Sequence, residues 1–196
     1  MLKRTFDITF SLIGLLVLLP FLLIIALLVI LESKGGIFYL QSRVGQHNVD
    51  FKLYKMRTMY RNADKRGLLT VGKRDYRITK IGYYLRKFKI DEFPQLFNIL
   101  IGDMSFVGPR PEVRSYVDLY TKEQLKVLNV KPGLTDFASL KYYHENEHLS
   151  QFDNPEEEYI NSVMPHKLAL NLKYIEKQNF KLDIWIIMKT LFKWQK

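Results

Sequence analysis

The residues from 8 to 31 are ITFSLIGLLVLLPFLLIIALLVIL, and this stretch decides what kind of protein the chain can form. It carries no charged residue, and Pro20 stands near its middle. A straight helix of this length would reach about 36 Å, which is enough to cross a hydrocarbon core of about 30 Å. The stretch is too long for a cleaved signal peptide, and the following ESKGG does not resemble a small-residue cleavage site. We therefore expect the segment to stay in the membrane.

The topology of this segment has two interpretations. Lys3 and Arg4 precede it and Lys34 follows it, so the positive-inside rule draws both ends to the cytoplasmic face. Pro20 removes a backbone donor and disfavours helical geometry at Leu19. A helix–break–helix that enters and leaves one leaflet satisfies both observations, whereas an ordinary spanning helix with a tolerated proline satisfies the length. These features alone give the two interpretations about equal weight.

The composition bounds the rest of the chain. Of 196 residues, 47% are hydrophobic and 26% are charged, which favours a packed domain over wholesale disorder. The absence of cysteine excludes disulfide scaffolds, Cys-ligated zinc, iron–sulfur clusters and thiol nucleophiles. A net charge of +10 favours anionic partners such as phospholipid headgroups, nucleic acid or phosphorylated small molecules, without choosing among them.

Beyond the apolar segment, the pattern predicts one small α+β domain over residues 34–196, mostly helical with a few short strands. We expect strands over 37–40 and 51–56, and a surface loop over 61–77 that is mobile or orders on a ligand. We expect helices over 78–88, 93–101, 112–128 and 165–178. A final amphipathic helix from residue 180 has Trp185, Trp194 and several lysines. It could lie in the membrane interface or pack on its own domain, with equal weight.

Asp91 and Glu92 are the first candidates for chemistry. They stand at the start of the predicted helix over 93–101, with Pro94 in its first turn. Acidic residues are common at such positions because they accept from free N–H groups, so a capping role is the simpler interpretation. A functional role needs an anionic substrate, since a helix N-terminus also attracts phosphate. A carboxylate kept ionised there could attack phosphorus covalently.

Arg110 is the second candidate, because it stands between Pro109 and Pro111. The proline that follows pushes it to extended geometry, and a guanidinium held in this way suits bidentate recognition of phosphate or of a planar base edge. By itself, a stiff loop with a solvent-facing arginine is the simpler interpretation. No phosphate-binding glycine loop and no trustworthy metal-ligand spacing of histidines occurs in the sequence. Further basic residues that could face an anion are Arg43, Lys55, Arg57, Arg77, Arg86 and Lys87.

The order and spacing of these motifs resemble the bacterial sugar transferase family, the monotopic phosphoglycosyl transferases. The resemblance covers nearly the whole chain and is most specific at DEFPQLFN over 91–98, GDMS over 102–105 and VGPRP over 107–111. Further matching stretches are QSRVG over 41–45, YKMRTM over 54–59, DYRITKIG over 75–82, LRK over 85–87, KPGLT over 131–135 and LD over 182–183.

The resemblance implies that a phosphosugar moves from a UDP-sugar to a membrane polyprenol phosphate (undecaprenyl phosphate), releasing UMP. Asp91 is implied as the nucleophile that forms a covalent phosphosugar intermediate. Glu92 beside it is implied to shape the site, handle protons or help to place Mg²⁺, so both carboxylates are metal candidates. Arg110, flanked by Pro109 and Pro111, is implied to bind nucleotide or phosphate. Arg86, Lys55 and Arg57 are weaker substrate-binding candidates.

The resemblance also implies a topology and leaves several questions open. Residues 1–33 are then a re-entrant membrane helix hairpin broken at Leu19 and Pro20, on a catalytic domain at the cytoplasmic face of the bacterial inner membrane. Leu19 replaces a common serine, Lys89 adds a charge near the dyad, and Asn171 replaces a common acidic residue, so it is given no metal role. The sugar choice is assigned to residues 135–164, and an N-acetylated, optionally 6-deoxy, sugar is expected by analogy.

An alternative of another class is a non-catalytic, membrane-tethered basic module that binds anionic lipid or nucleic acid. It accounts for the charge, the apolar segment and the Trp/Lys tail. It does not account for the order of the carboxylates and the proline-flanked arginine. We therefore favour the transferase, with membrane lipid and no nucleic acid among its partners, and leave a homodimer open.

Overall fold

The computed structural model describes residues 1–63, 75–142 and 145–193, and helices dominate it. Its few strands are short, which confirms the predicted mostly helical α+β class. The helices are α1 (Leu2–Glu32), α2 (Lys80–Lys87), α3 (Gln95–Ile101), α4 (Arg114–Val117), α5 (Phe137–Lys141), α6 (Glu145–Leu149), α7 (Pro155–Glu158), α8 (Met164–Lys177) and α9 (Phe180–Lys193). The strands are β1 (Phe38–Val44), β2 (Asp50–Met56), β3 (Ser105–Val107) and β4 (Gly133–Thr135).

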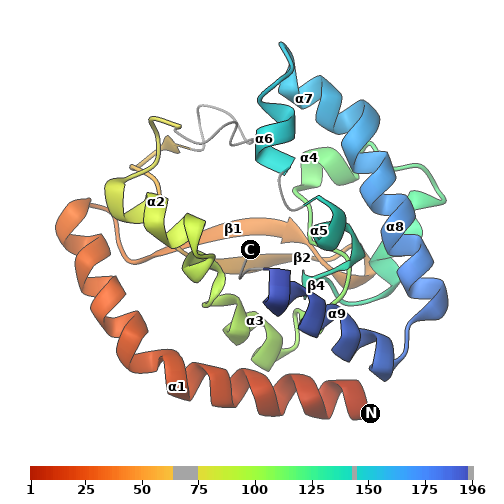
Figure 1. Cartoon of the computed structure of the whole chain (residues 1–196), viewed down its shortest axis with the longest axis horizontal. Helices are drawn as coiled ribbons and strands as arrows, with labels where there is room; N and C mark the ends of the chain where they lie inside the picture. Colours follow the sequence, from red (N-terminus) through yellow and green to blue (C-terminus); the bar gives the residue numbers. More distant parts are fainter. Residues whose placement is uncertain (64–74, 143–144, 194–196) are drawn as a thin grey trace.

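The apolar segment forms α1, a single helix with Pro20 in its interior. The helix curves around one side of the domain: its first part runs along the base and its second part rises beside α2 (Figure 1). A proline inside a helix removes one hydrogen bond and clashes with the preceding turn, which bends a helix without ending it. At Leu19 and Pro20 the structure therefore has helical residues within a bent helix, where the sequence predicted a break.

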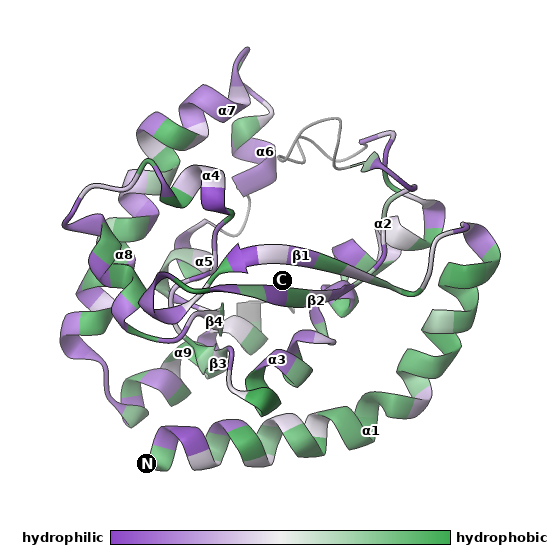
Figure 2. Ribbon diagram, turned by 180° about the vertical axis from the view of Figure 1, so that it is seen from behind, coloured by the Kyte–Doolittle hydropathy of each residue, from purple (hydrophilic) through white to green (hydrophobic). Residues whose placement is uncertain are grey.

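Most apolar side chains of α1 face away from the protein. Among the described residues it is the one helix long and apolar enough to cross a membrane, judged by length and composition. Leu16, Leu23 and Leu31 are more than 60% exposed. The hydrophobic colour of Figure 2 is accordingly concentrated along this helix. An exposed apolar surface of this size marks a membrane or protein contact, and here it fits membrane association.

Two small sheets organise the centre of the domain. Strands β1 and β2 form an antiparallel hairpin in which Phe38 pairs with Met56 and Val44 pairs with Asp50. Strands β3 and β4 form a parallel pair in which Val107 pairs with Thr135. Just beyond β3 the backbones approach so closely that a Cβ on Gly133 would lie 2.1 Å from the Gly108 nitrogen. Only glycine fits there, and this contact fixes where the segment carrying Arg110 begins.

The core consists of separate clusters. One cluster lies under α8 and includes Val113, Tyr159 and Leu168. Two others lie between α1 and the domain: one joins α1 to α2 and β2, and one joins α1 to α3 and β2. Part of the domain is thus built on the membrane helix, and part is built on a core of its own.

The structure confirms several predicted elements and corrects others. The strand over 51–56 and the helices over 78–88 and 165–178 are present as β2, α2 and α8. The predicted helix over 112–128 is wrong, because this stretch forms only α4 and a 3₁₀ turn, η4 (Gln124–Asn129). An irregular path buries both Tyr116 and Val127 in the core, and this tertiary burial outweighs helix propensity. Within the predicted loop over 61–77, residues 64–74 lie outside the described part.

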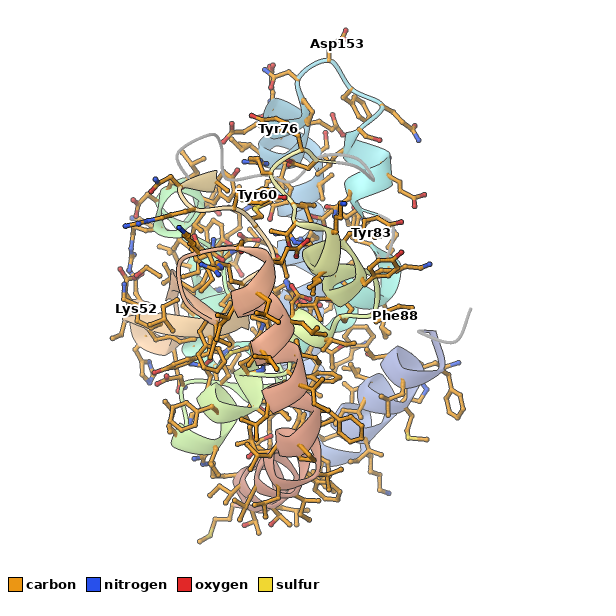
Figure 3. All side chains as sticks on the ribbon, turned by 90° about the vertical axis from the view of Figure 1, so that its left-hand side faces the viewer. Lys52, Tyr60, Tyr76, Tyr83, Phe88 and Asp153 are labelled. Atoms are coloured by element: carbon orange, nitrogen blue, oxygen red, sulfur yellow. The ribbon has the colours of Figure 1, made fainter. Side chains whose placement is uncertain are left out.

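Helix α9 packs on the domain along one face, which was one of the two expectations for the C-terminal segment. Ile186 is fully buried and packs with Val107 and Tyr174 in a small core. Trp185 and Phe192 are exposed, so an apolar surface remains beside the packed one. Trp194 lies outside the described residues. Seen from the side, α9 lies on the same side of α1 as the exposed Tyr83 of α2 and the exposed Phe88 just after α2, whereas Lys52 lies on the opposite side (Figure 3).

Candidate active site

The two candidate carboxylates lie on a short 3₁₀ turn, η3 (Ile90–Glu92), between α2 and α3. Helix α3 begins only at Gln95, so the pair precedes the helix that the sequence predicted it to open. Lys89 directly before the turn has a φ of 56°, in the left-handed region that few non-glycine residues adopt. Both carboxylates are largely buried, Asp91 to 7% exposure and Glu92 to 9%.

Asp91 and Glu92 line a cavity of about 530 Å³. This volume lies within the usual range for a small-molecule site. Its wall also carries many positive side chains, so a multiply charged anion fits it by both size and charge. The cationic residues that line the cavity are Arg43, Lys55, Arg57, Arg61, Arg77, Arg86, Lys89, Arg110 and Lys167.

Glu92 is held by positive partners. Its carboxylate forms an ion pair with Arg110, and the Lys55 Nζ lies 3.9 Å from its Oε1. Burial alone would raise the pKa of Glu92, but the charges of Arg110 and Lys55 outweigh it and hold the pKa well below its usual value. Glu92 is therefore ionised, and its carboxylate holds Arg110 and Lys55 in the wall of the cavity.

Asp91, the residue directly before Glu92, has a different environment. Its buried Oδ1 has no hydrogen-bond partner among the described residues. Burial first, and then the neighbouring charge of Glu92, raise the pKa of Asp91, although Lys55 and Arg86 oppose this. The expectation that the start of a helix keeps this carboxylate ionised is thus replaced by a balance between burial and nearby cations. Asp91 thus lines the cavity with an oxygen that no described residue engages, and an unpaired buried polar atom of this kind calls for an explanation.

The segment that carries Arg110 is fixed by its backbone. The Arg110 N–H donates to Asp136 Oδ2 at 3.3 Å, and the Pro109 carbonyl accepts from Gly133 N–H at 3.0 Å. The Arg110 side chain reaches the cavity, whereas Pro109 and Pro111 line a separate small hollow behind it. The two prolines thus set the path of the chain, and the guanidinium meets Glu92.

Asp136 is a site residue that the sequence analysis missed. Its Oδ2 also accepts from the Asn171 side chain at 2.8 Å, and its Oδ1 accepts from Ser139 N–H at 2.7 Å as the cap of α5. Asn171, which was given no metal role, therefore supports Asp136 and through it Arg110. The sequence signal was an aspartate at the start of a short helical stretch, and many caps share this signal.

The remaining cationic candidates differ in the residues that hold them. Lys55 lines the cavity, and burial lowers its pKa to about 8. The Arg86 Nε donates to Thr58 Oγ1 at 2.8 Å while the residue lines the cavity. Arg57 also lines the cavity, but its guanidinium donates to the Ser33 carbonyl just after α1. The Nε and Nη1 of Arg57 have no hydrogen-bond partner among the described residues, so Lys55, Arg86 and Arg57 all remain candidates for binding a ligand.

Asn98 is a second residue whose role only the structure shows. It is fully buried, and its side chain accepts from Tyr54 N–H at 3.0 Å and donates to the Lys52 carbonyl at 2.8 Å. These bonds join α3 to β2, the strand that carries Lys55. Asn98 therefore fixes α3, the helix that follows the dyad, to the strand that carries Lys55.

A divalent cation could be held here only with help from a ligand. The described residues contain no group of three or more His, Cys, Asp or Glu side chains placed to hold a metal. Mg²⁺ commonly binds through one or two carboxylates together with substrate phosphates and water. The free oxygen of Asp91 beside Glu92 fits that mode, and it does not fit an all-protein cage.

Comparison with known proteins places the chain in a family. The sequence profile described as bacterial sugar transferase matches residues 1–196. A UDP-N-acetylgalactosamine-undecaprenyl-phosphate N-acetylgalactosaminephosphotransferase of Aeromonas hydrophila is 35% identical over 192 residues, covering 96% of this chain and 42% of that protein. An exopolysaccharide production protein of Rhizobium leguminosarum bv. phaseoli is 43% identical over 197 residues, covering 97% of this chain and 93% of that protein.

A UDP-glucose:undecaprenyl-phosphate glucose-1-phosphate transferase of Escherichia coli is 33% identical over 196 residues, covering 98% of this chain and 40% of that protein. The chain thus spans about two fifths of the length of the Aeromonas and Escherichia proteins. The profile match covers all of the residues given, including the motifs whose side chains Asp91, Glu92 and Arg110 line one cavity. The chain belongs to the bacterial sugar transferase family.

Proposed function

We propose that the protein transfers a phosphosugar from a UDP-sugar to a polyprenol phosphate, such as undecaprenyl phosphate, and releases UMP. Relatives named for this kind of reaction support the proposal. The observation that carries it is the free, buried oxygen of Asp91 in a cavity lined by cations. Such an arrangement supplies both a nucleophile and a binding site for a diphosphate.

In the first step, a carboxylate oxygen of Asp91 attacks the sugar-linked phosphorus of the UDP-sugar. The bond from that phosphorus to the bridging oxygen breaks, and UMP leaves with this oxygen. In the second step, a phosphate oxygen of the polyprenol phosphate attacks the same phosphorus and displaces Asp91. The product is a polyprenyl diphosphosugar, and the aspartate is regenerated as a carboxylate.

The surrounding residues stabilise charge on the diphosphate. Arg110 and Lys55 are held near the dyad by Glu92, and Arg86 lies on the same cavity wall. Positive groups placed in advance around a transferring phosphoryl group are the usual source of catalysis in such reactions. Mg²⁺, which Asp91 and Glu92 would hold together with the substrate, would neutralise further diphosphate charge.

The membrane helix brings the two substrates to one surface. A UDP-sugar is soluble in water and a polyprenol phosphate lies in the bilayer, so the reaction needs a site at the membrane–water boundary. In this proposal α1 enters and leaves one leaflet at its Pro20 bend, with the domain on the cytoplasmic face of the inner membrane. A reporter fused to the N-terminus should be reached only from the cytoplasm, and labelling from outside the cell would overturn this topology.

The intact mass of the purified protein tests the chemistry. The protein is incubated with Mg²⁺ and a panel of UDP-sugars that includes UDP-N-acetylgalactosamine and UDP-glucose, without acceptor lipid. The wild type should gain the mass of one phosphosugar, and Asp91→Asn should gain none. UMP release with polyprenol phosphate is measured in parallel. An adduct on Asp91→Asn would refute the nucleophile, and no UMP from a broad panel would favour the non-catalytic module.

A further inference from the structure

The two parts of α1 pack against the two helices on either side of the dyad. Before the bend, Leu15 and Leu18 pack with Leu96 of α3 in one cluster. After the bend, Val29 packs with Leu85 of α2 in another. The bent membrane helix thus follows α3 and then α2, while the turn that carries Asp91 and Glu92 lies between those helices.

At its N-terminal end, α1 caps α3. The Arg4 guanidinium donates to the Ile99 carbonyl at 2.6 Å and to the Leu100 carbonyl at 2.8 Å. These are carbonyls of the last helical turn, where cations are stabilising because acceptors there lack partners within the helix. The planar fork of an arginine can satisfy two such oxygens at once.

At its C-terminal end, α1 caps α2. The Glu32 carboxylate accepts from Ile81 N–H, at 3.2 Å to Oε1 and 3.0 Å to Oε2. This N–H belongs to the first turn of α2, where donors lack partners and a negative charge is favourable. The loop before α2 supplies another cap, because Thr79 Oγ1 accepts from Gly82 N–H at 2.9 Å.

The dyad depends on these two helices for its position. Asp91 and Glu92 lie on the three-residue turn η3, which α2 precedes and α3 follows. A shift of either helix would therefore move the carboxylates relative to Lys55 and Arg110. Small displacements of reacting groups reduce catalysis strongly even when binding is little affected.

We propose that Arg4 and Glu32 are positioning residues, through which the membrane helix holds the two helices that carry the catalytic dyad. This inference rests on the proposed transferase activity. It predicts that loss of either cap lowers turnover far more than it weakens binding of the UDP-sugar. Neither Arg4 nor Glu32 lines the cavity that holds the dyad, so we expect their effect to pass through the placement of α2 and α3.

The test measures UMP release by the full chain in phospholipid vesicles that contain polyprenol phosphate. Arg4→Ala and Glu32→Ala should each lower kcat about tenfold or more, with the KM for the UDP-sugar within about twofold of wild type. Glu32→Gln should restore most of kcat, because its amide oxygen can still accept from Ile81 N–H. Thr5→Ala, next to Arg4 on the exposed side of α1, is the matched control and should keep the wild-type kcat.

Thr79→Ala separates positioning by α1 from simple capping of α2. It removes a cap that comes from the loop, so it should lower kcat less than Glu32→Ala does. An equal loss would overturn the proposal, and so would an unchanged kcat in Arg4→Ala and Glu32→Ala beside an active wild type. An inactive wild type would instead refute the proposed function. Thermal unfolding curves establish that each variant is folded, and Arg4→Lys replaces Arg4→Ala if the latter is not.

Discussion

The two walls of the cavity rest on different supports. The dyad wall comprises η3 and the end of α2. Its two flanking helices, α2 and α3, pack on α1 through Leu85 and Leu96. The arginine wall, which comprises the Arg110 segment, α5 and α8, stands beside a core built around Tyr159 and Leu168. The nucleophile candidate therefore lies between helices that pack on α1, whereas the Arg110 segment stands beside a core of its own. That segment meets α1 through polar contacts at β3, where Phe106 N–H donates to Asp7 and Lys3 donates to the Val107 carbonyl. This difference predicts that membrane contact governs chemistry more than it governs nucleotide binding.

The largest expected contrast comes from one substitution in each wall. Asp91→Asn should reduce turnover about 10⁴-fold while UDP-sugar binding changes only a few-fold, because a nucleophile is lost and the cationic wall remains. Arg110→Lys keeps the charge but loses the planar fork, so the KM for the UDP-sugar should rise about tenfold. Turnover assays and calorimetric titration with UDP-sugar measure the two effects. Equal losses of turnover in both variants would contradict the expected difference between the two walls.

A matched pair of core substitutions gives a smaller contrast. Leu85 in the dyad wall is 4% exposed and Leu168 beside the arginine wall is 5% exposed. Each Leu→Ala change should lower the free energy of unfolding by about 2–5 kcal/mol. Only Leu85→Ala should also lower kcat at temperatures where both variants are folded, because α2 carries the dyad turn. Thermal unfolding and turnover in the same vesicles decide this, and an equal kcat in the two variants would count against it.

The smallest effect is a pH dependence. Asp91 must be ionised to attack, so kcat/KM should rise with pH through the raised pKa of Asp91. Lys55, which faces Glu92, Asp91, Arg43 and Arg110, loses its proton near its pKa of about 8, so kcat/KM should fall above that pH. Each limb changes the rate by at most about tenfold per pH unit. Lys55→Arg should shift the alkaline limb upward, and an unshifted limb would assign it to another group.

Some features of the protein follow from local sequence, because short-range chemistry determines them. The uncharged run around Pro20 determines a long apolar helix, since its composition leaves no other stable state in lipid. The alternation and spacing over 51–56, 78–88 and 165–178 determine β2, α2 and α8. The candidate residues Asp91, Glu92, Arg110, Lys55 and Arg86 were named from sequence, and the structure brings all five to one cavity.

Other features were decided by tertiary contacts. The irregular path over 112–128 arises because packing around Tyr116 and Val127 outweighs helix propensity. The opposite pKa shifts of Asp91 and Glu92 arise because cations from distant segments reach one carboxylate more closely than the other. Asp136, Asn98, Arg4 and Glu32 act on partners far along the chain, and no local pattern specifies which backbone group a polar side chain will meet. The charged candidates that line the cavity could thus be named from the sequence, whereas the residues that support them and the pairs they form were decided by the fold.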